Sequence, residues 1–330
     1  MRRMAFSAKV LDLDLEKEAE RIVSKLRQQV LGTMRKKGGV LGISGGIDSA
    51  CTAALCARAF GPDRVLGIFM PERDSADESL QFGRQLAEKF GIPTVTEVLA
   101  DSLAAMGCYR WREGAVKKAC PEWQPGWPWK IVLPSILESD RLNFYYLVVK
   151  RPGGEDLQIR LPLEEYLTIV AATNMKQRLR KATEYFHGDR MNYAVAGTPN
   201  RLEYDQGFFV KQGDGAADFK PIAHLYKTQV YAMAAHLGVP AEICRRSPTT
   251  DTYSYAQGQD EFYFALPYPK MDLCLYGKDH GVPAAEVAPA VGLSAEQVER
   301  VFKDIDAKRR FARYLHARPM LIEKVGSVEE

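Results

Sequence analysis

The sequence has no long hydrophobic run, no strong net charge and no closely spaced pair of cysteines. None of its apolar stretches reaches the roughly 18 residues that a membrane-spanning helix needs, so we expect no membrane partner. Its 45 basic and 42 acidic residues leave a net charge of +3, which is too small to predict a nucleic-acid partner. The six cysteines include no CxxC pair, which argues against a zinc ribbon or a redox pair.

A secretion signal is not expected either. Met1–Phe6 is basic and then apolar, but Lys9, Asp12 and Asp14 interrupt the apolar stretch that such a signal needs. We therefore expect a cytoplasmic protein. Its 330 residues, 46% of them hydrophobic and 26% charged, are typical of a globular enzyme, and we interpret residues 1–330 as a single domain.

The first hundred residues alternate between helices and strands. Apolar side chains recur at helical spacing between Leu15 and Lys37, and Gly38-Gly39 ends that helix. Further along, short apolar strands alternate with helices: strands at 40–43, 65–70 and 93–98, helices up to Phe60 and at 75–90. This order predicts an α/β fold with a doubly wound, Rossmann-like parallel sheet.

Residues 107–163 break this alternation and contain all four tryptophans. Strand-like runs at 144–149 and 157–161 flank Arg151-Pro152-Gly153-Gly154, which predicts a hairpin. We interpret the segment as a flap inserted into the domain. Its aromatic side chains either stack on a substrate base or sugar, or pack on their own domain or a dimer partner, and the sequence favours neither alternative.

The α/β pattern then resumes and ends in helices. We expect a helix at 167–188, a strand at 193–196, a polar loop at 197–220, helices at 227–237 and 261–275, and a last helix running from Ser294 toward Leu315. Gln297 follows Ser294 by three residues, which forms a capping box.

Ser44-Gly45-Gly46-Ile47-Asp48-Ser49, between a strand and a helix, predicts a phosphate-binding loop. Glycines allow a tight turn that aims backbone N–H groups at an anion, and the helix start adds its dipole. The Asp48 carboxylate can reach a magnesium ion that bridges phosphates. No lysine follows the glycines, and the spacing is not GxGxxG, so neither a Walker loop nor a dinucleotide cofactor is expected. The candidate ATP-binding residues here are Gly42, Ile43, Ser44, Gly45, Gly46, Ile47, Asp48 and Ser49.

This hexapeptide resembles the pyrophosphate loop of the N-type ATP pyrophosphatases. Further stretches resemble NAD synthetases in particular: 174–180 resembles their N-x-K-x-R-x-R helix, 197–204 their G-T-x-N-x-x-E loop, 207–218 their G-Y/F-F-T-K-x-G-D-G-x-x-D stretch, and 221–230 their P-I-x-x-L-x-K-T-x-V stretch. Order and spacing both agree, over about residues 15–105 and 165–320. A tRNA-thiolating enzyme of the same superfamily is disfavoured, because no cysteine lies near these motifs.

The resemblance implies roles for individual residues. Thr198, Lys227 and Thr249 correspond to ATP-binding positions, and Asp48 and Glu203 to magnesium ligands. Arg178, Lys211, Asp218 and Lys308 correspond to substrate-binding positions. Asp48, Lys211 and Asp218 are the candidate catalytic residues, with Asp218 accepting a proton from the incoming ammonium.

Two of these positions are unusual for helices. Arg178 and Arg180 point about 200° apart on a helix, so we expect one to meet ligand and the other to pair with an acidic neighbour. Lys227 begins a helix, where a cation opposes the dipole, and this unfavourable placement hints at a function.

The reaction implied by the resemblance uses ATP as co-substrate and Mg²⁺ as cofactor. Transfer of AMP to a carboxylate makes a mixed anhydride that ammonia can attack, which converts deamido-NAD to NAD with release of AMP and pyrophosphate. No glutaminase domain fits in the sequence, so the amine is free ammonia or ammonia delivered by another protein. The resemblance also implies a homodimer.

The sequence departs from the family pattern in three places. The stretch 248–261 replaces P-S/T-A-D-L-x-x-x-Q-x-D-E, Ala307 stands where the family has a histidine before Lys308, and the tryptophan-rich flap is an addition. All three fall where substrate rather than ATP would bind. A paralogue that amidates a different carboxylate is therefore the alternative, and a non-catalytic nucleotide-binding protein is a more remote one.

Overall fold

A computed structural model describes residues 6–133, 145–246, 253–255, 263–264, 266–323 and 325. Its main sheet has the order β3-β2-β1-β7, and all of its strands run parallel. The strands are β1 (Gly39–Gly42), β2 (Val65–Phe69), β3 (Thr94–Thr96) and β7 (Ala194–Val195). The order reverses between β1 and β7, which is where open α/β sheets bind ligands. The predicted doubly wound sheet is confirmed.

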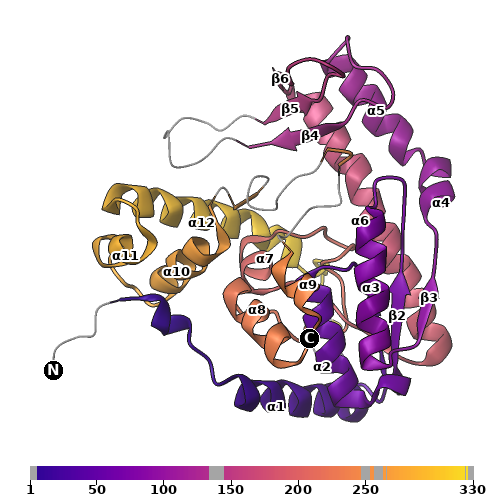
Figure 1. Ribbon diagram of the computed structural model, residues 1–330, viewed down its shortest axis with the longest axis vertical. Helices are drawn as coiled ribbons and strands as arrows, with labels where there is room; N and C mark the ends of the chain where they lie inside the picture. Colours follow the sequence, from indigo (N-terminus) through magenta and orange to yellow (C-terminus); the bar gives the residue numbers. More distant parts are fainter. Residues whose placement is uncertain are drawn as a thin grey trace.

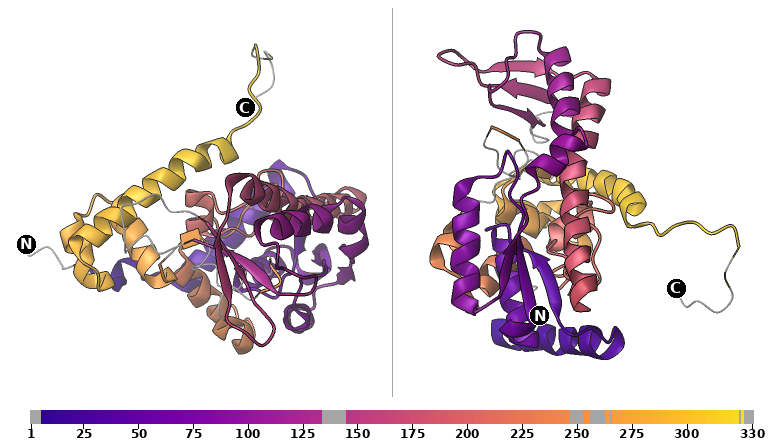
Figure 2. Two further views of the ribbon diagram at one scale, coloured as in Figure 1. Left: turned by 90° about the horizontal axis from the view of Figure 1, so that it is seen from above. Right: turned by 90° about the vertical axis from the view of Figure 1, so that its right-hand side faces the viewer.

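Helices cover both faces of this sheet. Helices α2 (Ile47–Phe60) and α3 (Asp77–Phe90) contact each other on one face. The long helix α6 (Leu163–Met191) contacts β1 and β7, and Figure 2 (right) shows it on the opposite side of the strands from α3. Helix α1 (Leu15–Leu26) begins where the Asp14 carboxylate accepts a hydrogen bond from the Lys17 N–H at 3.1 Å, and a π-helical turn (Arg27–Thr33) extends it.

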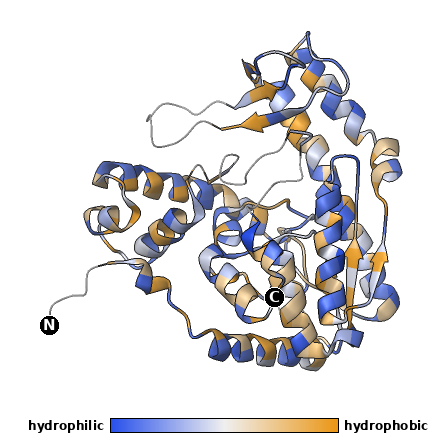
Figure 3. Ribbon diagram, in the orientation of Figure 1, coloured by the Kyte–Doolittle hydropathy of each residue, from blue (hydrophilic) through white to orange (hydrophobic). Residues whose placement is uncertain are grey.

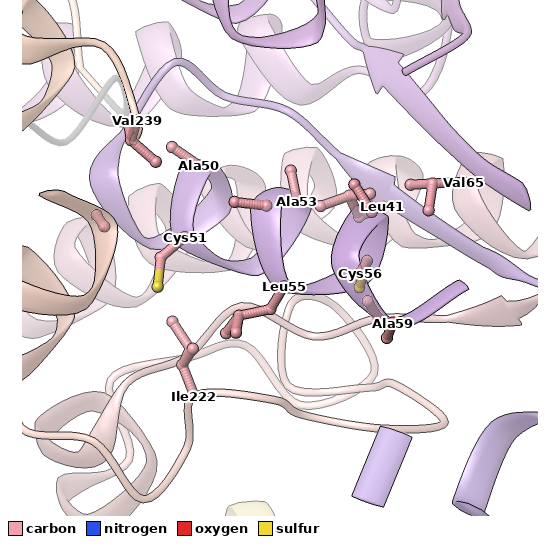
Figure 4. Packing of buried hydrophobic residues seen from close by; sticks show 14 of the residues in the cluster. Leu41, Ala50, Cys51, Ala53, Leu55, Cys56, Ala59, Val65, Ile222 and Val239 are labelled. Atoms are coloured by element: carbon pink, nitrogen blue, oxygen red, sulfur yellow. The ribbon is translucent and has the colours of Figure 1, made fainter. Parts of the chain in front are cut away.

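The core surrounds α2, which is apolar on almost all sides. Its side chains are buried between the sheet, α1 and α8 (Lys227–His236), and Figure 4 shows Cys51, Leu55 and Cys56 among them. Alanine and cysteine suit a helix packed from several directions, since small side chains let neighbouring elements approach closely. In Figure 3, which is coloured by hydropathy, the strands are hydrophobic and the helices next to them have one polar face.

The inserted segment forms a helix and a small sheet at one end of α6 (Figure 1). Strands β4 (Trp129–Val132), β5 (Tyr146–Val149) and β6 (Leu157–Arg160) pair antiparallel in that order. The predicted hairpin is thus confirmed as β5–β6. Sequence reasoning missed β4, α4 (Ala100–Ala105) and α5 (Cys108–Ala119), which packs along α6.

The carboxyl-terminal helices pack into a second hydrophobic cluster with Leu202. They are α10 (Tyr268–Asp279), α11 (Ala284–Val291) and α12 (Ala295–His316), and α9 (Ala241–Arg245) precedes them. The predicted capping box is confirmed, because the Ser294 hydroxyl accepts from the Gln297 N–H at 3.1 Å. No helix among the described residues is long and apolar enough to cross a bilayer.

Two predicted boundaries were wrong. The helix expected at 261–275 is interrupted: Tyr263 and Phe264 are π-helical, residues 261, 262 and 265 lie outside the described residues, and α10 begins at Tyr268, after Pro267 in an extended conformation. The polar loop expected at 197–220 contains a short helix, α7 (Arg201–Gln206), whose start carries a capping box formed by Asn200 and Glu203.

Candidate active site

A cavity of about 910 Å³ lies at the carboxyl ends of β1 and β2 and continues along α6. Its lining residues come from the turn after β1, the loop after β2, the segment after β7, and one face of α6. Of the predicted ATP-binding residues, Gly42, Ile43, Ser44, Gly46, Ile47, Asp48, Ser49, Thr198 and Lys227 line it. Thr249 lies outside the described residues.

The predicted phosphate loop has the geometry of an anion site. Ser44 and Ser49 hold the turn closed, because the Ser49 hydroxyl lies 3.1 Å from that of Ser44 and donates to the Gly46 carbonyl at 3.0 Å. Gly45 adopts φ +75°, and a Cβ there would lie 2.3 Å from the Ser79 carbonyl oxygen. Gly45 does not line the cavity, but only glycine allows this turn, which carries the chain into the amino terminus of α2.

Asp48 is the centre of a small cluster of polar side chains beside this loop. One carboxylate oxygen accepts from the Asn200 amide at 3.0 Å, and the other accepts from the Lys227 ammonium. Glu203 completes the cluster, and its side chain accepts from the Asn200 N–H at 3.0 Å. The residues come from α2, α7 and α8, so the fold brings together three motifs that are far apart in the sequence.

Burial and mutual charge shift the ionisation of this cluster. Burial and the neighbouring Asp48 charge raise the pKa of Glu203 to about 8. Burial alone would lower the pKa of the Lys227 ammonium, but Asp48 and Glu203 raise it above its ordinary value. Two carboxylates therefore share one buried lysine. Within the described parts of the chain, no group of three or more His, Cys, Asp or Glu side chains could hold a metal ion.

Asp272 of α10 explains how a lysine can begin α8. Its two carboxylate oxygens accept from the backbone N–H groups of Lys227 at 3.2 Å and Thr228 at 2.8 Å. A buried carboxylate thus caps the helix start and offsets the unfavourable cation. Burial raises the pKa of Asp272 to about 6. No local signal marks Asp272 in the sequence, because it lies far along the chain from the helix that it caps.

The two arginines on α6 do not divide as predicted, because Arg178 and Arg180 both line the cavity. Although residues two apart point about 200° apart on a helix, the long side chains of both reach the cavity. The Arg178 guanidinium donates to the Lys211 carbonyl at 3.3 Å. Lys211 also lines the cavity; its ammonium donates to the Tyr314 carbonyl at 2.9 Å and lies over the Tyr314 ring.

Asp218 and Lys308, both predicted to bind substrate, do not line the cavity. The Asp218 carboxylate accepts from the Val195 N–H at 2.7 Å and the Tyr185 hydroxyl at 3.2 Å. The Lys308 ammonium donates to Asp304 at 2.6 Å and to the Tyr263 carbonyl at 2.7 Å.

Asp214, in the same motif as Asp218, does line the cavity, and sequence reasoning overlooked it. Its carboxylate accepts from the Val210 N–H at 2.7 Å, and burial raises its pKa above the usual range. A Gly-Asp-Gly sequence inside the matched stretch was the available signal.

Three of the four tryptophans of the inserted segment, Trp123, Trp127 and Trp129, pack on their own domain. Trp123 and Trp129 are buried in a cluster with β4 and β5, Trp111 is exposed, and none of the four lines the cavity. One aromatic residue at the edge of the segment does line it, namely Tyr145.

Comparisons with known proteins agree with these features. The model of the NAD synthase family matches residues 18–118 and 159–315. An NH3-dependent NAD+ synthetase of Mesorhizobium japonicum is 58% identical over 96% of this chain and 99% of its own length, and one of Rhizobium meliloti is 56% identical over 99% and 98%. Among solved structures, NMN synthetase from Francisella tularensis shares the fold, with a TM-score of 0.65 and 21% identity over 94% of this chain and 99% of its own.

Proposed function

The chain belongs to the NAD synthase family and carries out the ATP-dependent amidation of deamido-NAD with ammonia, and we propose that the cluster around Asp48 is the centre of this reaction. The observation that supports the assignment is the convergence of Asp48, Glu203 and Lys227 beside a phosphate loop.

The first step activates the carboxylate. A carboxylate oxygen of the substrate attacks the α-phosphorus of ATP, the bond to pyrophosphate breaks, and an acyl adenylate forms. We propose that the N–H groups of the 44–49 turn hold the ATP phosphates. The Lys227 ammonium, now paired with Asp48, faces the same cavity and offsets the charge that builds on the departing pyrophosphate.

The carboxylates suit a magnesium ion. Burial first, and then the charge of Asp48, raise the pKa of Glu203, and a divalent cation held by the two carboxylates would offset both effects. Mg²⁺ in nucleotide sites is held by one or two carboxylates together with substrate phosphates, which is the donor set available here. When bound, the ion neutralises charge on the leaving pyrophosphate.

The second step needs a proton acceptor, since ammonia is mostly ammonium near neutral pH. We assign this role to Asp214 rather than to Asp218. Asp214 lines the cavity, and its raised pKa brings the carboxylate closer to the range of an effective base. The Asp218 carboxylate instead accepts hydrogen bonds from the Val195 N–H and the Tyr185 hydroxyl, and so holds the end of β7. The ammonia that forms when ammonium gives its proton to Asp214 attacks the acyl carbon, the bond between that carbon and the phosphate oxygen breaks, and AMP leaves.

We also propose a homodimer that uses the outer face of α6. Leu163, Leu167 and Phe186 are 71%, 55% and 62% exposed, and Ala171 and Ala182, which lie between them along the helix, are exposed as well. A row of exposed apolar side chains along a helix is typical of a protein interface.

The proposed location is the cytoplasm, where ATP and deamido-NAD are available.

The test is product analysis of the purified protein with ATP, Mg²⁺, ammonium and deamido-NAD. We expect NAD, AMP and pyrophosphate in equal amounts, and much slower turnover of nicotinate mononucleotide. The Asp48→Asn variant keeps the size of the side chain and should lose pyrophosphate release by at least about 100-fold. Asp306→Asn, which changes a surface ion pair with Lys278, is the matched control. Full turnover by Asp48→Asn would contradict the assignment.

A further inference from the structure

The inserted segment contributes a side chain to the cavity even though its tryptophans do not. Tyr145 directly precedes β5 and lines the cavity. Its ring stacks on that of Tyr166 in the first turns of α6, with centroids 4.2 Å apart and planes 17° from parallel. Its carbonyl accepts from the Leu161 N–H at 2.9 Å, which fixes the backbone at this position.

Two further tyrosines, Tyr253 and Tyr263, line the cavity, and the insertion holds the first of them. Tyr253 packs on Trp129 of β4 with ring centroids 5.2 Å apart. The Trp129 N–H donates to the Ser254 hydroxyl, and its carbonyl accepts from the Tyr255 N–H, both at 3.2 Å. With Tyr263, which also lines the cavity, these residues form what we call the tyrosine wall: Tyr145, Tyr166, Tyr253 and Tyr263.

Tyr145 and Tyr166 of the tyrosine wall lie far from the phosphate loop. Gly42, at the start of that loop, is close to Glu184, since a Cβ on Gly42 would lie 3.0 Å from the Glu184 carboxylate. Tyr166 and Glu184 are on the same helix, and 18 residues of α-helix span about 27 Å. An ATP molecule whose phosphates occupy the loop is too short to place its adenine ring at the wall.

A dinucleotide is long enough to reach it. The nicotinate carboxyl of deamido-NAD must lie at the α-phosphate of ATP, so the adenosine is the end that extends along α6. The cations Arg178 and Arg180 line the cavity between the two ends, where the pyrophosphate of the dinucleotide would pass. The order along the cavity is therefore phosphate loop, cations and aromatic wall, and in the substrate the nicotinate, pyrophosphate and adenine follow one another in the same order.

We propose that the tyrosine wall binds the adenine ring of deamido-NAD and that Tyr145 makes the insertion a specificity element for dinucleotides. Flat aromatic side chains favour such a ring, because stacking on a base needs no particular pattern of hydrogen bonds. The family model leaves residues 119–158 unmatched, so Tyr145 is an addition to the family model, whereas the other three tyrosines of the wall lie within the matched range 159–315. The inference rests on the proposed function, since deamido-NAD must be the substrate.

The test compares substrates that have and lack the adenine end. Tyr145→Ala should raise the KM for deamido-NAD by about 5- to 150-fold, the range found when a base loses a stacking partner. The KM for ATP and the slow turnover of nicotinate mononucleotide should not change, and Tyr145→Phe should behave like the wild type. Tyr146→Ala is the matched control, because Tyr146 is the next residue along the chain but does not line the cavity.

Two results would overturn the proposal. One is an increase in the KM for ATP with no change for deamido-NAD, which would assign the wall to the other nucleotide. The other is no change in either KM in a variant whose melting temperature is normal. Failure of the proposed function looks different, because the wild-type protein itself would then make no NAD.

Discussion

Replacing Arg112 should destabilise the protein through a buried charge imbalance. Arg112 lies on α5, its side chain is 0% exposed, and it forms an ion pair with Asp74. Lys176 of α6 lies 2.7 Å from Asp74 and 2.8 Å from Glu72, and all three side chains are at most 4% exposed. Two cations thus balance two carboxylates in a region from which water is excluded. Arg112→Met keeps much of the side-chain volume and leaves one carboxylate uncompensated.

The size of the effect follows from burial. Removing one partner of a buried ion pair typically costs about 3–5 kcal/mol, because the other charge stays buried. Lys176 still contacts Asp74, so the lower end of this range applies, about 3 kcal/mol. The Arg112 guanidinium also lies 5.2 Å from the centre of the Trp129 ring, and the loss of that contact adds roughly 0.5–1 kcal/mol.

Urea unfolding followed by tryptophan fluorescence measures this loss. The double variant Arg112→Met/Asp74→Asn restores the balance of one cation and one carboxylate, so it should recover a large part of the lost free energy of unfolding. Arg73→Met, which breaks an ion pair with Glu113 at the surface, should cost less than about 1 kcal/mol. If Arg112→Met unfolds like the wild type, or if the double variant is no more stable than the single one, the charge-balance argument is refuted.

Two further predictions concern acidic side chains near the cavity. Asp272→Asn keeps one acceptor for the start of α8 and loses the other, so it should cost about 1–2 kcal/mol at pH 7. Because burial raises the pKa of Asp272 to about 6 from its ordinary 3.8, the folded protein still binds a proton that the unfolded chain has released between these pH values. The stability of the wild type should therefore fall as the pH rises from about 4 to about 6, and melting curves of Asp272→Asn should lack this part of the pH dependence. Asp214→Asn should lower turnover at pH 7 by about 10²- to 10⁴-fold, and the deficit should shrink toward pH 9, where more of the ammonium is already deprotonated. An equal deficit at both pH values would argue against Asp214 as the proton acceptor.

The sequence alone predicts the helices and strands whose residues follow a local pattern. Strands β1 to β3 and the helices between them follow from apolar runs and glycine turns, and the phosphate loop follows from the residues at its turn. Helix α7 also had a local signal, because Asn200 and Glu203 have the spacing of a capping box, but the polar loop around it hid the helix. The late start of α10 was likewise readable from Pro267.

Other features depend on contacts that no local pattern encodes. Asp272 caps α8 from another helix, and nothing near it in the sequence indicates that role. Asp214 and Asp218 belong to one motif and have the same side chain, yet one faces the cavity and the other holds the end of β7. Only the path of the backbone between them decides which carboxylate can meet a ligand.

Helix α6 separates the chemistry from the selection of the substrate. Its 29 residues span about 43 Å, with the tyrosine wall near one end and Glu184, beside the phosphate loop, near the other. A change at the wall can therefore alter which substrate binds without moving the groups around Asp48. The buried pairs of Arg112 and Lys176 with Asp74 join the inserted segment and α6 to the loop after β2, which itself lines the cavity. A rigid connection of this kind allows an inserted segment to contribute a binding surface, because the surface then keeps a fixed distance from the reacting carboxylate.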